Sequence, residues 1–321
     1  GLLNGTPDWA RPATEARLPG DIARASHTPL LVENAVGVIG FYAGPTVTVV
    51  DRAALCDPLL ARLPMVAADP LAIDLMRRVS GAEPLHSWRI GHFTRNLPRG
   101  YLSSLLTGQN KIVDPRAAAL YADVSTITRA PLWSPARWAA IFRQRWTLPS
   151  PIAVTRLPFE SPDWNEVLAL RPNDAQALFR RAARSDNPGP DLERAVAIAP
   201  QHALAWMDLG SWRQRNGDTA SALTAWHHAS EAAPRWAAPW IATGVAQAKA
   251  GQLEQAIVSL QRAQSVDPRN IGSYAPLGLA LIQSGQKDRA RQVLQRGSAW
   301  NDESSRRLLA ALDQADSPAD P

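Results

Sequence analysis

The stretch from Pro234 to Pro268, PRWAAPWIATGVAQAKAGQLEQAIVSLQRAQSVDP, has a pattern that continues on both sides of it. Four kinds of residue recur at intervals of 34: a proline, an aromatic residue, a glycine and an alanine. The columns are Pro200, Pro234 and Pro268; Trp206, Trp240 and Tyr274; Gly210, Gly244 and Gly278; and Ala222, Ala256 and Ala290. This period and these residue types are typical of a repeated helix–turn–helix unit, in which neighbouring units stack and build a binding surface.

Each column has a packing role in such a unit. The glycines and alanines are expected where two helices approach too closely for a larger side chain, and the aromatic column fills the gap between the helices. The matching large residues of the second helices are Trp226, Leu260 and Leu294, and turns are expected at Asn216-Gly217-Asp218, Gly251 and Gly285. Several of the tryptophans therefore have a packing role and are not expected to stack on carbohydrate.

The period divides the second half of the chain into units. Complete repeats are expected at 203–236, 237–270 and 271–304, within a three-repeat segment spanning 203–304. A degenerate first repeat, 164–202, has helices at Ala175–Arg184 and Leu192–Ala199, with an insert at Asp186–Pro190 in place of the usual turn. A last helix at Glu303–Gln314 gives a capping segment over 305–316, and the tail at 317–321 is expected to be disordered.

This pattern resembles the tetratricopeptide repeat (TPR) over nearly half of the chain. The resemblance implies a concave groove lined by positions of each first helix. These positions are Leu204, Met207, Ser211, Gln214, Arg215, Ala238, Ile241, Val245, Ala248, Lys249, Gly272, Ala275, Leu279, Ile282 and Gln283. The lining is mostly apolar and lacks the Lys, Asn and Arg set that grips a C-terminal carboxylate. The implied partner is an apolar protein segment such as a helix. The alternative is that this chain's own first domain or last helix fills the groove.

The first half of the chain has a different character. Residues 1–29 are expected to be irregular, with a short helix around Asp21–Ser26. The apolar runs Pro29–Tyr42 and Thr46–Val50 are expected to form two buried strands joined by a Gly44-Pro45 turn. Helices are expected at 52–64, Leu71–Val79, Pro115–Ser125 and Pro135–Arg145, with an aromatic and basic loop at 84–101 and a Pro-rich linker at 149–163. The predicted fold class is α+β: a small α/β domain over 30–148, followed by an all-α solenoid.

Composition limits the function classes. The net charge of +5 lies entirely in residues 1–160, without the basic stripe that nucleic-acid binding requires. The single cysteine, Cys56, excludes an internal disulfide. No membrane-spanning helix or signal peptide is predicted, because the apolar run Asn34–Val50 is shorter than about 20 residues and is interrupted by Gly and Pro. Because the chain begins with Gly1, we interpret it as processed or as a piece of a longer product.

Two blocks in the first half carry a second resemblance. The first block runs from VGVIGFY (36–42) through VVDR (49–52) to CDPLLARLP (56–64), and the second joins WRIGHF (88–93) to PRGY (98–101). Over about residues 30–145 the chain resembles the soluble C-terminal region of bacterial GT-C-type membrane glycosyltransferases, which use polyprenyl-phosphate sugars. The AALC sequence at 53–56 departs from the aromatic-Gly-Leu pattern usual in that group.

The resemblance implies that the catalytic membrane part lies outside this chain. The chain alone is then a non-catalytic interaction module at the extracytoplasmic (periplasmic) face of a bacterial inner membrane, reaching the membrane only through upstream segments, and no cofactor is expected. The alternative is a stand-alone soluble TPR adaptor, with a cytoplasmic location as the other possibility. A protein partner is expected in either case.

The basic and aromatic loop allows a second ligand class, a glycan or a polyprenyl-phosphate. Arginine forks bind phosphate and aromatic faces stack on sugars. The candidates are Trp88, Arg89, His92, Arg95, Arg99 and Tyr101. The alternative is that these residues hold a long loop on the domain, with arginines pairing to Asp51 or Asp57.

A third hypothesis, an independent enzyme, would use Glu33, Asp51 and His92, although an Asp at a strand end is commonly a cap or an ion-pair partner. No metal site is expected, because the adjacent His227 and His228 do not face each other on a helix.

Overall fold

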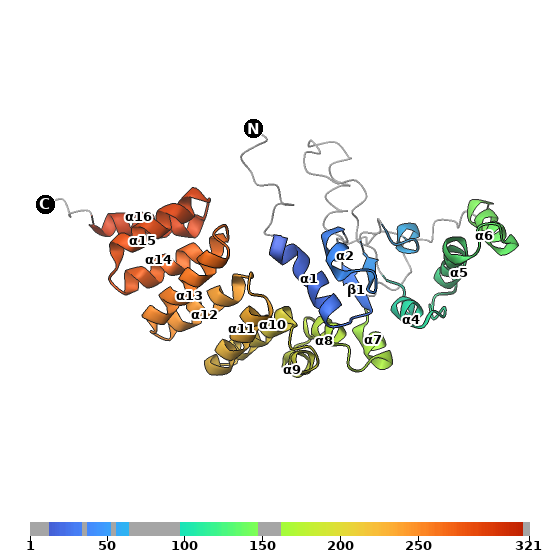
Figure 1. Cartoon of the computed structure of the whole chain (residues 1–321), viewed down its shortest axis with the longest axis horizontal. Helices are drawn as coiled ribbons and strands as arrows, with labels where there is room; N and C mark the ends of the chain where they lie inside the picture. Colours follow the sequence, from blue (N-terminus) through green and yellow to red (C-terminus); the bar gives the residue numbers. More distant parts are fainter. Residues whose placement is uncertain (1–12, 34–36, 53–55, 64–96, 147–161, 317–321) are drawn as a thin grey trace, which may run out of the picture. The chain divides into compact units, whose positions relative to one another are not determined.

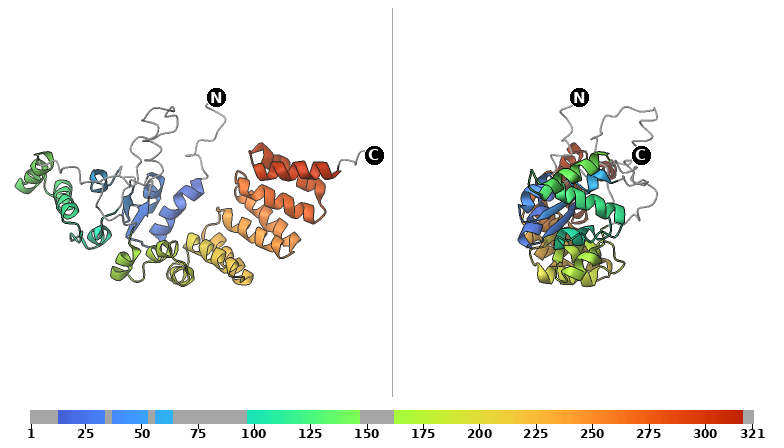
Figure 2. Two further views of the ribbon diagram at one scale, coloured as in Figure 1. Left: turned by 180° about the vertical axis from the view of Figure 1, so that it is seen from behind. Right: turned by 90° about the vertical axis from the view of Figure 1, so that its right-hand side faces the viewer.

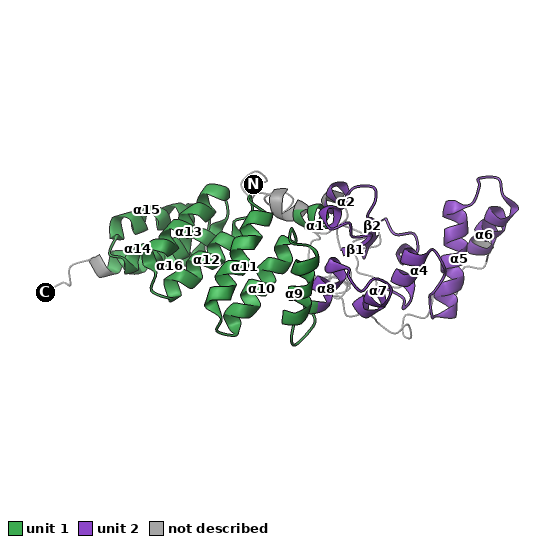
Figure 3. Cartoon of the chain, turned by 60° about the horizontal axis from the view of Figure 1, so that its bottom comes forward, with its two compact units in different colours: residues 1–22, 182–321 green, residues 23–181 purple. Residues whose placement is uncertain are grey.

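The computed structural model describes residues 13–33, 37–52, 56–63, 97–146 and 162–316. Within these ranges the chain is mostly helical (Figure 1). No helix in the described part is both long and apolar enough to cross a membrane. The chain divides into two compact units, one made of residues 1–22 with 182–321 and the other of residues 23–181, shown in different colours in Figure 3. The division falls inside the segment expected as a degenerate first repeat.

The three expected repeats are present as helix pairs in the first unit. Figures 1 and 2 show the paired helices stacked one after another. The pairs are α10 (Ala203–Arg215) with α11 (Thr219–Ala232), α12 (Ala238–Lys249) with α13 (Leu253–Val266), and α14 (Tyr274–Gln283) with α15 (Lys287–Ala299). Helix α9 (Gly189–Ile198) precedes them, the 3₁₀ turn η3 (Ile271–Ser273) leads into α14, and α16 (Glu303–Asp316) closes the array.

The glycine column marks the closest approach within each pair. A Cβ atom added to Gly210 would lie 2.4 Å from Nε1 of Trp226. At Gly244 and Gly278 the added atom would lie 2.5 and 2.4 Å from side-chain carbons of Leu260 and Leu294. The alanine column, Ala222, Ala256 and Ala290, is fully buried. The predicted packing of small residues on the first helix against large residues on the second is therefore confirmed.

The aromatic and proline columns are joined by a repeated hydrogen bond. The indole Nε1 of Trp206 donates to the carbonyl oxygen of Pro200 at 2.8 Å. The hydroxyl of Tyr274, two repeats later, donates to the carbonyl oxygen of Pro268 at 2.7 Å. Both bonds tie the first turn of a helix to the end of the preceding unit, which fixes how one repeat follows another.

Turns inside the repeats require glycine. Gly217, Gly251 and Gly285 have φ values of +84°, +77° and +79°, in the left-handed region that other residues adopt at a cost. Asp218 follows the first of these turns, and its carboxylate accepts a hydrogen bond from the backbone N–H of Ser221 at 3.0 Å, which caps α11.

The second unit contains one pair of short parallel strands, the only strands among the described residues. β1 (Leu30–Glu33) pairs with β2 (Thr48–Asp51), from Leu30 opposite Thr48 to Glu33 opposite Asp51. Helix α2 (Gly37–Ala43) lies between them in sequence. The expectation of a continuous strand through Tyr42 was therefore wrong. Parallel neighbours need a crossover connection, usually a helix, and this topological demand overrides the β propensity of Val and Ile.

The remaining helices of this unit follow their sequence signals in part. Helices α5 (Pro115–Arg129) and α6 (Pro135–Trp146) confirm the expected helices there, and Asp114 caps α5 through the backbone N–H of Arg116 and Ala117. The helix expected over 52–64 appears in residues 56–63 only as the 3₁₀ turn η2 (Leu60–Arg62). The helix expected at Leu71–Val79 lies outside the described residues. Helices α4 (Tyr101–Thr107) and α7 (Trp164–Leu170) also belong to this unit, and α8 (Ala175–Ala182) precedes α9. Most of α1 (Ala13–Ala25) belongs to the first unit, and this helix lies in the segment that was expected to be irregular.

The glycine column predicts the effect of a single methyl group. Gly210→Ala places a Cβ 2.4 Å from the Trp226 ring, so the ring must shift and strain the pair α10–α11. We expect the free energy of unfolding, measured by denaturant titration, to fall by about 1–3 kcal/mol. Gly40→Ala in α2 is the control, because no atom lies within 4 Å of the added Cβ. Equal stability of the two variants would contradict the steric role of Gly210.

Candidate functional site: the groove of the repeats

The first helices of the second and third repeats line a cavity of about 470 Å³. Its wall includes seven of the positions expected to line the groove: Val245, Ala248, Lys249, Gly272, Ala275, Leu279 and Gln283. Leu279, on the first helix of the third repeat, is a large apolar side chain and is nevertheless 43% exposed. The cavity thus presents an apolar surface at positions where the repeat resemblance implies contact with a ligand.

Helix α16 forms a wall of this cavity that the groove prediction did not include. Ser304 and Leu308 line it from α16, together with Asp302 just before that helix and Ile271 and Pro276 from the third repeat. Leu308 lies one further period of 34 residues after Tyr274, so α16 takes the place of another first helix. Extending the period by one unit is the signal that would have found this wall.

The cavity carries one basic side chain, Lys249. Among the described residues this ammonium group makes no ion pair, and it lies in the last turn of α12. Asp302 is buried, and its carboxylate accepts hydrogen bonds from the backbone N–H of Ser304 and the hydroxyl of Ser305. Its charge is therefore engaged at the start of α16, and Lys249 is the group available to an acidic ligand.

Helix α1 covers the groove at the first repeat. Leu18 and Ile22 are buried in a cluster with Ala203, Ala233 and Trp236. Three expected groove positions, Leu204, Met207 and Ala238, pack against the same cluster. At this repeat the chain's own N-terminal helix fills the groove, although the sequence analysis had named only the first domain and the last helix as occupants. The cavity at the later repeats has no such cover among the described residues.

The remaining groove positions have other surroundings. Ile241 and Ile282 are half-buried and pack against the core cluster that contains Leu277 and Leu281, so they hold repeats together. Gln214 donates to the hydroxyl of Thr219 at 3.2 Å.

A second cavity of about 470 Å³ includes Ser211 and Arg215 in its wall. Asp186, Asp208 and Trp212 also line this cavity, which is the more polar of the two. Burial raises the pKa of Asp208, and the positive charge of Arg215 partly opposes this shift.

The candidates in the basic and aromatic loop are only partly described. Trp88, Arg89, His92 and Arg95 lie outside the described residues. The side chain of Arg99 is exposed. Tyr101 is buried, and its hydroxyl donates to Oδ2 of Asp57 at 2.7 Å. The hydrogen bond of Tyr101 therefore joins the two motif blocks, and it is made by a tyrosine where the sequence analysis had named arginines as partners of Asp57.

Asp57 is the centre of this contact. Its Oδ1 accepts hydrogen bonds from the backbone N–H of Leu59 at 3.0 Å and of Leu60 at 2.9 Å, which starts the 3₁₀ turn η2. Burial raises the pKa of the Asp57 carboxyl, while the hydrogen bonds from Leu60, Tyr101 and Leu59 oppose the shift. The hydrogen bonds explain why the DPLL sequence at 57–60 forms a turn.

The weak catalytic candidates have structural partners. Glu33 and Asp51 are directly opposite each other in the strand pair. Glu33 pairs with Arg180, and burial raises the pKa of its carboxyl despite that positive charge. Asp51 is buried and accepts a hydrogen bond from the backbone N–H of Cys56 at 3.0 Å. His92 lies outside the described residues. No group of three or more potential metal ligands occurs in the part of the chain that the structure describes.

The comparisons with known proteins bear on the repeats. Residues 247–315 match the tetratricopeptide repeat. Two crystal structures of MamA are similar: one is 20% identical, covers 44% of this chain and 87% of that one, and has a TM-score of 0.41. The other is 19% identical, covers 49% of this chain and 85% of that one, and has a TM-score of 0.40. No curated protein matches the chain in sequence.

The matched repeats include the whole of α13 to α15 and the greater part of the cavity wall. The C-terminal half is therefore a helical repeat scaffold of the kind that binds other proteins. The resemblance of residues 30–145 to membrane glycosyltransferases receives no support from these comparisons.

The cover formed by α1 predicts a stability effect. Leu18→Ala combined with Ile22→Ala removes two buried side chains from the cluster on the first repeat. We expect the free energy of unfolding to fall by about 2–5 kcal/mol, measured by denaturant titration. Ile198→Ala on α9 is the control, because that side chain is exposed and its removal should cost little. An unchanged free energy of unfolding for the double variant would contradict the packing of α1 against the first repeat.

The buried carboxyl of Asp57 predicts a pH dependence. Because its pKa is raised in the folded state, folding binds a proton between that pKa and the unfolded value of about 3.9. The wild-type chain should therefore gain stability relative to Asp57→Asn as the pH falls through this window from neutrality. The measurement is denaturant titration of both proteins at several pH values. A stability difference that is constant with pH would contradict a raised pKa of Asp57 in the folded chain.

Proposed function

We propose that this chain is a non-catalytic interaction module whose repeats bind an apolar helix of a protein partner in the cavity between α12, α14 and α16. The observation that carries the proposal is the apolar cavity of about 470 Å³ lined by Val245, Lys249 and Leu279. These residues occupy first-helix positions, and Leu279 and Ile271 leave large apolar surface exposed there. Exposed apolar surface of this kind on a repeat scaffold supports partner binding.

Helix α1, which fills the groove at the first repeat, supports the proposal that the ligand of the later repeats is also a helix. On the first repeat, Leu18 and Ile22 of α1 stand four residues apart, which places them on one face of their helix. They pack against Leu204 and Met207, whose counterparts one and two repeats later belong to the same expected lining. A partner helix with two apolar residues at this spacing would use the later repeats in the same way. An acidic residue beside them would complement Lys249.

We further propose that the module belongs to a bacterial membrane glycosyltransferase and works at the periplasmic face of the inner membrane. This rests on the motif blocks at 36–64 and 88–101. A glycan or polyprenyl-phosphate bound through Trp88, Arg89 and Arg95 belongs to the same proposal. A stand-alone cytoplasmic adaptor is the alternative. The sequence of the gene upstream of the Gly1 codon tests it: membrane-spanning segments there would support the proposal, and a start codon next to Gly1 would contradict it.

A charge placed in the cavity predicts loss of binding. A photo-reactive group at Gln283, on the cavity wall, would first identify the partner segment by cross-linking and mass spectrometry. Leu279→Asp should then weaken binding of a synthetic peptide of that segment by at least about tenfold, since a carboxylate would be buried against apolar surface. The measurement is the dissociation constant from peptide titration.

The matched control is Val258→Asp. Val258 is an apolar side chain on α13 that is 65% exposed and lies outside the cavity. This variant should leave the dissociation constant unchanged. Ile241→Asp is a poorer test, because Ile241 packs against the core between repeats and its loss would reduce stability. Equal binding by Leu279→Asp and the wild-type chain would contradict recognition in this cavity.

A further inference from the structure

An exposed aromatic face lies on α6 and the turn before it, in the second unit. Trp133 is 78% exposed, Trp138 42% and Phe142 54%. Their rings form a row, with centroids 6.2 Å apart between Trp133 and Trp138 and 6.3 Å apart between Trp138 and Phe142. Leu132 extends the same apolar surface. Soluble proteins seldom expose large apolar side chains side by side unless the surface binds something.

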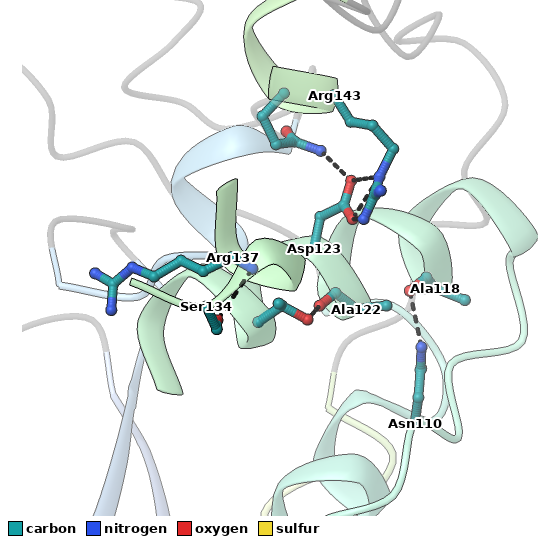
Figure 4. A network of polar contacts seen from close by, with 9 residues as sticks. Asn110, Ala118, Ala122, Asp123, Ser134, Arg137 and Arg143 are labelled. Carbon is teal, nitrogen blue, oxygen red and sulfur yellow. Dashed lines mark hydrogen bonds and ion pairs between the residues drawn. The ribbon is translucent and has the colours of Figure 1, made fainter. Parts of the chain in front are cut away.

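The surroundings of this aromatic face are basic. From Val124 to Gln144 the chain has three arginines, Arg129, Arg137 and Arg143, and no Asp or Glu. The carboxylate nearest in sequence, Asp123 on α5, accepts hydrogen bonds from Arg143, as Figure 4 shows. It also accepts one from the side chain of Gln144. Arg137 donates to the backbone carbonyl of Ala130, which places its guanidinium at the turn that carries Trp133. Asp123 compensates Arg143, whereas Arg129 and Arg137 make no ion pair within the described part of the chain, so positive charge accompanies the aromatic side chains.

This combination favours a lipid surface over a glycan. Sugar-binding sites pair an aromatic face with acceptor groups that bind the sugar hydroxyls, and the acceptor carboxylate nearest to this face is already held by two partners. Interfacial helices have the composition seen here, with Trp, Phe and Leu on one face and arginine beside them. Tryptophan in particular places its amphipathic ring at the level of the lipid headgroups.

We propose that α6, with Leu132 and Trp133 before it, docks the second unit on an anionic membrane surface. Helix α6 has 12 residues, too few to cross the roughly 30 Å hydrocarbon core. It lies in the plane of the interface, with the rings of Trp133, Trp138 and Phe142 inserted among the headgroups. Arg129 and Arg137 contact the lipid phosphates. This surface is separate from the repeat cavity, so the chain brings a protein partner to a membrane.

The test is vesicle co-sedimentation of the full chain. Vesicles of phosphatidylcholine alone are compared with vesicles that contain phosphatidylglycerol in equal part. We expect binding to the anionic vesicles, weakened when salt is raised from about 0.1 M to about 1 M, because screening shortens the Debye length from about 10 Å to about 3 Å. Trp133→Ala with Trp138→Ala should lower the partition coefficient by about tenfold or more. Arg129→Gln should lower it by about fivefold.

Trp300→Ala is the matched control, because it removes an exposed tryptophan from the other unit and should leave vesicle binding unchanged. Trp133→Ala alone keeps the test decisive if the double variant does not fold, since that side chain is mostly exposed. Three results would overturn the proposal. The first is no binding of the wild-type chain to anionic vesicles, and the second is binding of the tryptophan variants that equals wild-type binding. The third is binding of a glycan or a protein at this face in place of vesicles.

Discussion

The close approach of two helices at each glycine is the constraint on which the repeat array depends. Gly210, Gly244 and Gly278 let the first helix of each pair come within contact of a large side chain on the second, where even a methyl group would collide. A second, local contact sets how one pair follows the next, since Trp206 and Tyr274 each donate a hydrogen bond to the carbonyl oxygen of the proline six residues earlier. Repetition of the same contact stacks the pairs and leaves the first helices to line a groove.

The groove is used unevenly along its length. At the first repeat it is closed by α1, whose Leu18 and Ile22 have become part of the core. At the second and third repeats the same kind of surface remains open as a cavity, with Leu279 exposed and Lys249 at the wall. The exposed face of α6 belongs to the other unit and has a different chemistry. The chain thus carries an open apolar cavity in its first unit and an exposed aromatic face beside arginines in its second.

The sequence predicted the elements that depend on local periodicity and failed where distant segments decide the outcome. The repeats, their turns and the packing of the glycine column follow from a spacing of 34 residues. The segment after Glu33 was wrongly expected to remain a strand through Tyr42, because Val and Ile favour strands locally. The pairing of β1 with β2 in parallel requires a crossover, and α2 supplies it. Of the expected groove, the cavity at the later repeats lies where the pattern indicated, but its α16 wall was missed.

The sequence by itself determined the repeat, because no unit can bury its apolar face alone and each needs the same small and large residues at the same offsets to stack on its neighbours. Only the tertiary structure decided which parts of the resulting surface stay open. The contact of α1 with the first repeat joins segments far apart in the chain, and so does the hydrogen bond of Tyr101 to Asp57. The exposure of Trp133 and Trp138 depends equally on what packs nearby. The repeat pattern does not predict such contacts, because the burial of a side chain depends on which distant segments pack against it in the folded chain.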